Sequence, residues 1–314
     1  MTIARASRTF RGILALAPPH PEARRGALAA VGAFTFWGII PIYWKFLAHI
    51  SPVELIMHRA VWSLVFLLGV LRWQDRLATV WAAFKSPRVL GLNFATGTLL
   101  MGNWLTFIWA VNNDHILDSS LGYFLVPLFN VAAGFVLFHE RPRPLQWIAI
   151  ALAASGVAWL LFRVDHVPWV ALIIVATWSG YGLIRKKSPM GALDGLTVET
   201  LLYLPLTAGY LIWLAWHGRG AIGHVSPTEH VLVFCSGWIT AIPLVWFAYG
   251  AVRIRLTTLG LLQYIAPSLA FLVGWLVYRE PFDGLRAISF GLIWCGLACY
   301  SADSFWTQRK ALVG

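Results

Sequence analysis

The sequence predicts an all-α polytopic membrane protein with ten transmembrane helices in two inverted repeats of five. Its composition, its long apolar runs and an internal repeat lead to this prediction. Of its 314 residues, 59% are hydrophobic and 12% are charged, whereas a soluble domain carries about 25% charged residues. This is too little charge to coat a water-exposed surface of that size. Three cysteines cannot form a disulfide framework, and the composition excludes disordered, coiled-coil and collagen-like chains.

Ten apolar runs are long enough to cross a bilayer, since a spanning helix needs about 20 mostly apolar residues. Charged residues, Pro and Gly separate the runs. The longest connection, from Arg72 to Arg88, leaves no room for a separate soluble domain. We expect the spans at 28–48, 53–71, 89–111, 118–138, 144–162, 167–184, 196–216, 230–251, 256–278 and 285–304.

The distribution of basic residues predicts the orientation. Eighteen of the 24 Lys and Arg residues lie in the termini and in every second connection, and only four lie in the alternate connections. Because basic loops favour the cytoplasm, we expect both termini there. The net charge of +11 therefore reflects membrane topology, and we predict no nucleic-acid partner. Residues 1–26 are expected to form a basic cytosolic leader, and residues 309–314 a cytosolic tail.

The two halves of the chain resemble each other in sequence. Displacing the sequence by 140 residues aligns identical residues, including Pro, Gly and Glu, which chance matching of apolar segments rarely supplies. The aligned pairs are Pro127–Pro267, Gly134–Gly274, Glu140–Glu280, Leu145–Leu285, Ile148–Ile288, Leu152–Leu292, Gly156–Gly296 and Ala158–Ala298. We therefore predict one repeat over residues 27–164 and a second over residues 165–308.

Each predicted repeat contains five spans, so the second repeat enters the membrane from the opposite side. Inverted repeats of this kind are typical of secondary transporters, whose site lies between the halves near the bilayer midplane. Two near-equivalent halves can provide two states of similar energy, one open to each side. The alternative interpretation is that duplication only built a stable helical bundle.

The chain resembles the EamA family of the drug/metabolite transporter superfamily from about residue 25 to residue 309. The most specific stretch runs from Asn103-Trp104 to Tyr123, and Glu140-Arg141, Arg185-Lys186-Lys187 and Gln263-Tyr264 add to it. The resemblance implies ten helices in two inverted repeats and permease activity across the bacterial inner membrane. His139 and Val126 depart from the family pattern, which often has Gly and Asn at these two positions.

Ionisable residues within spans are costly, by at least ~2.5 kcal/mol at the bilayer centre, and mark functional sites by default. Glu54 and His58 are four residues apart and therefore share one helix face. Together with Lys45 and Arg59 they predict a gating or proton-coupling cluster at the outer mouth, because His titrates near neutral pH. Glu199 is its expected counterpart on the cytosolic side. The alternative is a static charge network that holds helix ends together.

Aromatic side chains and a few amides at mid-depth predict a cavity for a small-molecule substrate. The alternative for each of them is tight helix packing. The candidate cavity residues are Trp37, Asn103, Trp104, Tyr123, Gln263 and Tyr264. Pro127 and Pro267, at equivalent positions of the repeats, predict helix breaks beside the site.

The sequence lacks the phosphate-binding loop G-x-x-x-x-G-K-[ST], the H-E-x-x-H motif and a dinucleotide fingerprint, so it predicts neither an enzyme nor a cofactor or metal. We expect a non-ATPase secondary transporter, an exporter driven by protons, in the bacterial inner membrane. Its expected partners are a small-molecule substrate and the lipid bilayer, with a homodimer as one candidate assembly. The open alternatives are a membrane sensor or assembly subunit without transport, and an intramembrane enzyme.

Overall fold

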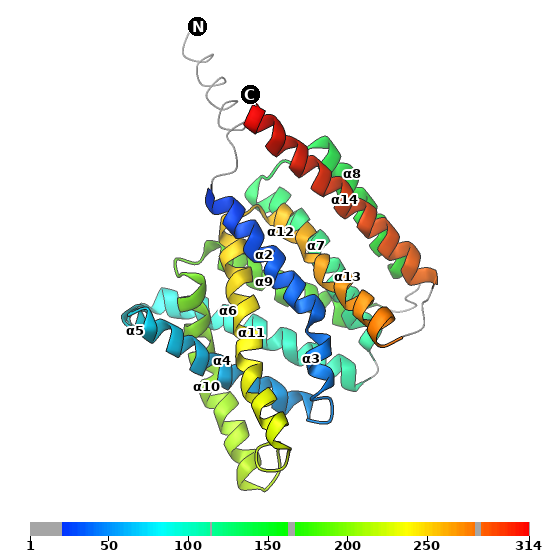
Figure 1. Ribbon diagram of the computed structural model, residues 1–314. Coiled ribbons are helices and arrows are strands. Elements are labelled where there is room, and N and C mark those ends of the chain that lie inside the picture. Colours follow the sequence, from blue (N-terminus) through cyan, green and yellow to red (C-terminus); the bar gives the residue numbers. More distant parts are fainter. Residues whose placement is uncertain (1–20, 114, 163–166, 280–283, 314) are drawn as a thin grey trace.

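The computed structural model describes residues 21–113, 115–162, 167–279 and 284–313. In these ranges all regular secondary structure is helical, with no strand (Figure 1). The elements are α2 (Pro21–Ile39), α3 (Pro41–Lys45), α4 (Pro52–Trp73), α5 (Leu77–Phe84), α6 (Pro87–Asn112), α7 (Ile116–Phe138), α8 (Pro144–Leu161), α9 (Trp169–Lys187), α10 (Ala192–Trp216), α11 (Pro227–Arg253), α12 (Leu256–Gln263), α13 (Ile265–Leu272), the π-helical turn η1 (Val273–Val277) and α14 (Gly284–Val313).

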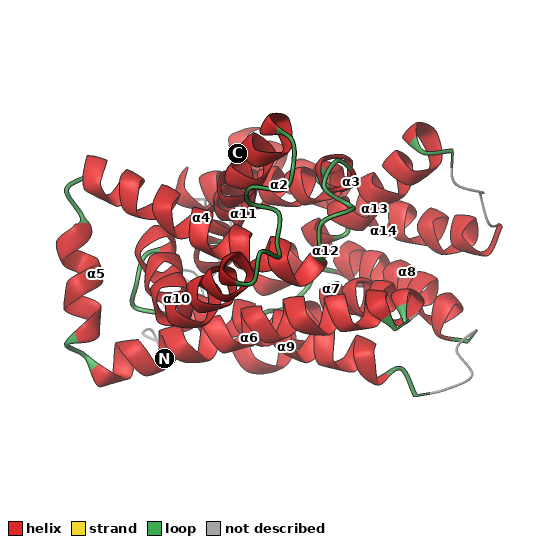
Figure 2. Cartoon of the chain, turned by 90° about the horizontal axis from the view of Figure 1, so that it is seen from below, coloured by secondary structure: helices red, strands yellow, loops and turns green. Residues whose placement is uncertain are grey.

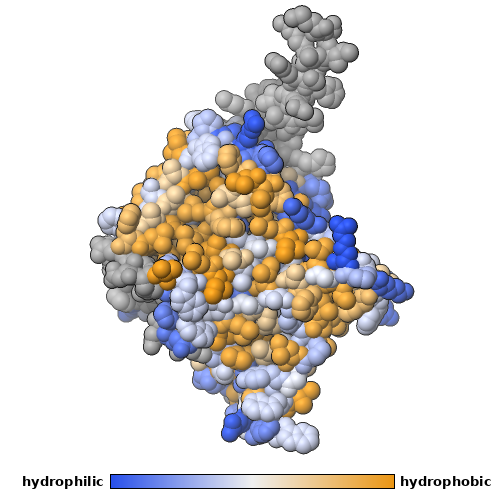
Figure 3. All heavy atoms as spheres, turned by 180° about the vertical axis from the view of Figure 1, so that it is seen from behind, coloured by the Kyte–Doolittle hydropathy of each residue, from blue (hydrophilic) through white to orange (hydrophobic). Residues whose placement is uncertain are grey.

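Each of the ten apolar runs lies on one long helix or on consecutive helical segments. By length and composition, seven stretches in the described part of the chain can cross a membrane. They are Pro21–Lys45, Pro52–Trp73, Asp118–Phe138, Pro144–Leu161, Ala192–Trp216, Pro227–Arg253 and Leu256–Val277. The protein is therefore an all-helical, multi-pass membrane protein. Hydrophobic side chains cover most of the face in Figure 3, and hydrophilic ones gather near its edges.

Three element boundaries differ from the expected ones. Helix α2 begins at Pro21, inside the segment expected to be leader, because Pro suits a first helical position and Glu22 in the first turn favours the helix N-terminus. Residues 1–20 lie outside the described residues. The long connection after α4 contains the short helix α5, which stands at the edge of the bundle between α4 and α6 (Figure 2). Helix α14 continues to Val313, through the expected cytosolic tail.

Proline has different effects in the two expected helix breaks. Helix α7 passes through Pro127 without interruption, so the expected break at this residue is wrong. One proline removes a single backbone hydrogen bond, and packed neighbours can compensate for that loss. In the second half the interruption lies at Tyr264, between α12 and α13. In a regular helix the ring of Pro267 would clash with the carbonyl group of Gln263, four residues earlier. The interruption comes directly after Gln263.

Close helix contacts depend on small residues, as is usual in membrane bundles. Helix α4 meets α11 where the Ser63 hydroxyl donates to the Gly237 carbonyl at 2.9 Å. A Cβ atom at Gly237 would overlap the backbone carbonyl carbon of Trp62. Helices α8 and α14 pair at one side of the bundle (Figure 1). There a Cβ atom at Gly156 would lie 2.8 Å from the Ser289 carbonyl oxygen.

The Gly237 contact predicts a position-specific cost of one methyl group. Gly237→Ala should lower the thermal midpoint of the purified protein in detergent by several degrees, because the overlap must separate α4 from α11 at a cost of about 1–3 kcal/mol. Gly69→Ala, in α4 with no atom within 4 Å of the added Cβ, is the matched control. It should leave the midpoint unchanged or raise it, since Ala favours helix over Gly by ~1 kcal/mol. Equal midpoints for the two variants would contradict this packing.

Candidate functional site

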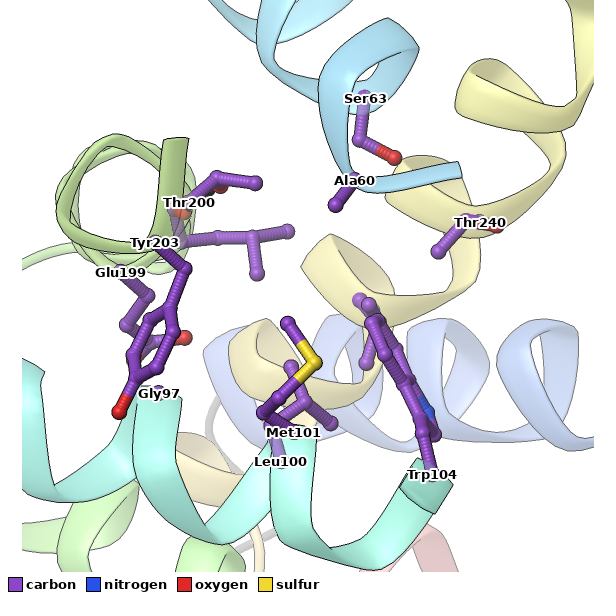
Figure 4. A pocket seen from close by; sticks show the side chains of 12 residues that line it. Ala60, Ser63, Gly97, Leu100, Met101, Trp104, Glu199, Thr200, Tyr203 and Thr240 are labelled. Atoms are coloured by element: carbon purple, nitrogen blue, oxygen red, sulfur yellow. Dashed lines mark hydrogen bonds between the residues drawn. The ribbon is translucent and has the colours of Figure 1, made fainter. Parts of the chain in front are cut away.

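Four helices, α4, α6, α10 and α11, surround a small pocket (Figure 4). Its walls combine apolar side chains with hydroxyls and one carboxylate. About 30 Å³ is open to water-sized molecules, room for roughly two waters at ~10–15 Å³ each. The pocket in this structure is therefore too small to hold a metabolite. The lining residues are Ala60, Ser63, Gly97, Leu100, Met101, Trp104, Leu196, Glu199, Thr200, Tyr203, Thr240 and Leu244.

Glu199 of α10 supplies the carboxylate of the pocket wall and is held by three side chains. The Thr96 hydroxyl donates to Glu199 at 2.6 Å, and Arg185 Nη1 and the Tyr181 hydroxyl lie 3.5 Å from its carboxylate oxygens. The side chains of Arg185 and Glu199 are each only 2% exposed. Substituting either partner of such a buried ion pair by a neutral residue destabilises the protein, because the remaining charge stays buried and uncompensated.

Arg185 is a site residue that sequence reasoning missed. The run Arg185-Lys186-Lys187 reads as a basic loop, yet Arg185 points into the bundle and also donates to the carbonyls of Gly191 and Ala192, each at 3.2 Å. Tyr181 lies four residues earlier and therefore on the same helix face. The sequence signal for Arg185 was its spacing of four residues from Tyr181. Of Arg185, Lys186 and Lys187, only Arg185 has this spacing and lies on the buried face.

Arg59 of α4 lies beside the pocket and contacts two of its lining residues. Its guanidinium carbon is 4.7 Å from the ring centre of Trp104 and 4.8 Å from that of Trp44. Its Nε donates to the Thr240 hydroxyl at 2.9 Å. These contacts join α3, α4, α6 and α11 around one positive charge.

At one end of the bundle, Glu54 and His58 form a buried pair. His58 Nε2 lies 3.5 Å from Glu54 Oε1, and the Ala221 amide donates to the same oxygen at 2.5 Å. Gly220 has a φ of +113°, which favours glycine, in the turn that presents this amide. Lys45 does not join the pair, because its side chain is exposed and its Nζ lies 4.6 Å above the Tyr278 ring.

At the other end, Asp194 of α10 connects to the short helix α5. Arg76 Nη2 lies 2.5 Å from Asp194 Oδ2, and the Thr79 hydroxyl donates to Asp194 Oδ1 at 2.8 Å. The sequence alone does not predict this contact, since it depends on α5. This contact and the Glu54–Ala221 contact thus connect segments at opposite ends of the bundle.

Of the six candidate cavity residues, Trp104 alone lines this pocket. The others connect neighbouring helices. Trp37 packs in an aromatic cluster with Phe34, Trp178 and Phe247. Asn103 accepts from the Tyr123 hydroxyl and donates to Thr177, both at 3.0 Å. Gln263 accepts from Asn130 at 3.2 Å, and the Tyr264 hydroxyl donates to the Phe124 carbonyl at 3.2 Å.

Glu140, identified in sequence through the repeat and the family resemblance, has a clear structural role. Its carboxylate accepts from the amides of Leu256 and Thr257 at 2.7 and 2.9 Å and from the Thr257 hydroxyl at 2.7 Å. It therefore caps the N-terminus of α12 from the end of α7. Its repeat counterpart, Glu280, lies outside the described residues. Among the described residues, no three His, Cys, Asp or Glu side chains gather to hold a metal.

Comparisons with known proteins agree with this architecture. Residues 24–162 match the EamA-like transporter family. A Vibrio cholerae protein described as an uncharacterized transporter is 43% identical over 92% of this chain and 95% of its own length. Protein RarD of Escherichia coli is 37% identical, over 92% of this chain and 98% of that protein.

Two further similarities extend over most of the chain. The chloramphenicol-sensitive protein RarD of Pseudomonas aeruginosa is 32% identical over 91% of this chain and 96% of its own length. A solved crystal structure superposes with a TM-score of 0.69 at 21% identity, covering 89% of this chain and 98% of that one, and it supports the fold alone. With relatives this similar over nearly their whole length, the chain belongs to the EamA-like transporter family.

Proposed function

We propose that this protein is a secondary carrier that exports a small metabolite or drug across the bacterial inner membrane by alternating access. The observation that carries the proposal is the position of the pocket, whose walls come from α4 and α6 of the first predicted half and α10 and α11 of the second. A site between two halves can be exposed to either side when the halves rock against each other. Both termini lie in the cytoplasm in this proposal.

The helix contacts support two inverted halves, residues 27–164 and 165–308, with five spans each. In this division α2–α3, α4, α6, α7 and α8 correspond in order to α9, α10, α11, α12–η1 and α14. Helix α2 packs on α11, and the counterpart pair, α9 and α6, is also in contact. Helix α7 packs on α9, and α12 and α13 pack on α2. In two halves related by a twofold axis, each contact between two helices is expected to recur between their counterparts.

The pairing of α8 with α14 gives residue-level support for the same axis. A Cβ atom at Gly156 would meet the Ser289 carbonyl oxygen at 2.8 Å, and one at Gly296 would meet the Ala149 carbonyl oxygen at 2.7 Å. Both residues of the second contact are equivalent, at a displacement of 140, to those of the first. Likewise Tyr264 hydrogen-bonds to Phe124, its own counterpart at that displacement.

The contacts that close the two ends are proposed gates. Glu54 and Ala221 close the end that faces outward, and Arg76, Thr79 and Asp194 close the cytoplasmic end. Each gate consists of few polar contacts, so its opening costs little beyond the loss of those contacts. The buried Glu54–His58 pair is the proposed proton-coupling element, because a carboxylate and an imidazole in contact change charge together when protons are exchanged.

The proposed topology predicts that Lys85 and His224, both exposed, face opposite sides of the membrane, because five helices separate them. In a background with the three native cysteines replaced by Ser, an impermeant maleimide should label His224→Cys on intact cells. It should label Lys85→Cys only after permeabilisation. Labelling of both sites from one side would contradict the inverted halves, and the reverse pattern would contradict the orientation.

The carrier proposal predicts that proteoliposomes loaded with a bacterial metabolite extract lose at least one compound class under a pH gradient, because protons drive export. Mass spectrometry of vesicle contents measures the loss against protein-free vesicles. Retention of every compound, with either direction of the gradient, would contradict proton-driven export.

The proton-coupling proposal predicts that the Glu54→Gln/His58→Ala double variant loses the pH dependence of that efflux and slows it at least tenfold, because the titrating pair is gone. The matched control is Glu229→Gln/His49→Ala, a surface Glu–His pair in contact at 3.1 Å. It should transport like the wild type, and vesicle efflux measured from pH 5.5 to 8.5 distinguishes the two. An unchanged rate and pH profile in both variants would remove the Glu54–His58 pair from the mechanism.

A further inference from the structure

Arg59 is a partly buried cation that has no counter-ion among the described residues. No carboxylate oxygen of these residues lies within the 4.0 Å of an ion pair with it, whereas the buried Arg185 has Glu199 at 3.5 Å. Its contacts are two indole rings and one hydroxyl. None of these groups carries a negative charge, so the site keeps a net positive charge beside the pocket.

The hydrogen-bonding capacity of Arg59 is also largely unused. A guanidinium has five N–H donors in a fixed planar fork. One of them, on Nε, donates to the Thr240 hydroxyl, and the Nη donors have no acceptor among the described protein groups. In a membrane protein an ionisable group that faces the bundle interior marks a substrate or ion pathway. An unused fork of donors fits a planar carboxylate, which it can bind through two parallel hydrogen bonds.

The residues that hold Arg59 link it to the pocket. Trp104 and Thr240 contact the guanidinium and also line the pocket, and Ala60, the next residue in α4, lines it as well. Trp44 of α3 also contacts the guanidinium through its ring. A substrate that widens the pocket toward Trp104 and Thr240 therefore approaches the guanidinium that both residues contact.

We propose that Arg59 is the anion-recognition residue of this carrier, and that its substrates are small organic acids whose carboxylate pairs with the Arg59 fork. This inference rests on the proposed function and names the substrate class of the same pocket. The apolar wall, with Leu100, Met101 and Leu244, accommodates the hydrocarbon part of the acid. A purely structural Arg59 would join α3, α4, α6 and α11 and show no preference for acids.

The test compares carboxylic acids with their neutral amides, which share shape but lack charge. The full-length protein in detergent at pH 7.5 is titrated with acetate, isovalerate, benzoate and indole-3-acetate, and with the four corresponding primary amides. Binding is measured from the concentration dependence of the thermal midpoint. The wild type should bind at least one acid tenfold or more tightly than its amide. Absence of any such preference in the wild type would overturn the proposal.

Three variants locate the preference. Arg59→Gln should reduce it to less than twofold, and Arg59→Lys, which keeps the charge and loses the fork, should weaken it at least threefold. Arg88→Gln, an exposed arginine at the start of α6, is the control for net charge and should keep the full preference. Size-exclusion profiles report folding, and if Arg59→Gln is misfolded, Arg59→Lys decides. A preference that survives in a folded Arg59→Gln or is unchanged in Arg59→Lys would overturn the proposal.

Efflux of the same compounds from proteoliposomes separates this inference from the carrier proposal. Export of metabolites by the wild type without preference for acids would leave the carrier standing and overturn the anion site. Selective binding of acids without release of any of them from vesicles would instead contradict the carrier and leave the anion site standing. Acid-selective binding and acid-selective efflux, both lost in Arg59→Gln, are the expected result.

Discussion

Compensation of buried charge is the constraint on which the interior of this bundle depends. An isolated ion in an apolar environment is so costly that it must be paired, hydrogen-bonded or neutralised. Glu199 satisfies this through Arg185, Thr96 and Tyr181, and Glu54 through His58 and the Ala221 amide. Arg59 is satisfied only in part, by aromatic rings and one hydroxyl. This incomplete compensation of Arg59 is the basis of the proposed anion site.

The pocket is small in this structure. Polar contacts lie at the Glu54–Ala221 end and at the Arg76–Asp194 end of the bundle, and the pocket holds only water-sized molecules. A solute of metabolite size therefore requires rearrangement of α4, α6, α10 and α11. In a carrier, such a rearrangement exchanges states of similar free energy, and a ligand shifts the balance by its difference in affinity for them. Small residues at helix contacts, such as Gly237, let helices pack closely without interlocking large side chains.

Much of the architecture could be predicted from sequence because it depends on one-dimensional properties. Apolar run length located the long helices within a few residues, except for the start of α2 and the end of α14. The displacement of 140 identified Gly156 and Gly296, which lie at the α8–α14 contact. The i,i+4 spacing of Glu54 and His58 correctly indicated that they are neighbours. Helix α5 was not predicted, since its eight residues are too few for a membrane-span pattern.

The membership of the pocket could not be predicted in the same way, because depth along a helix does not specify which neighbour a side chain faces. Asn103, Tyr123 and Gln263 have the expected depth and polarity, yet they hydrogen-bond between helices outside the pocket. Lys45 is near Glu54 in sequence, but its side chain is exposed. Arg185 was hidden in a basic run. The rotation of each helix about its own axis depends on its packing against all neighbouring helices. The sequence pattern of one helix does not specify this packing.

The most direct test of alternating access measures both ends of the bundle in one protein. Spin-label pairs at Ser51 and His224, and at Lys85 and Lys187, report distances at the two ends in nanodiscs. Breaking the cytoplasmic gate with Asp194→Asn should lengthen the Lys85–Lys187 distance while the Ser51–His224 distance keeps its closed value, and Glu54→Gln should have the opposite effect. Two ends that lengthen together, or distances that respond to neither substitution, would contradict a carrier with alternating gates.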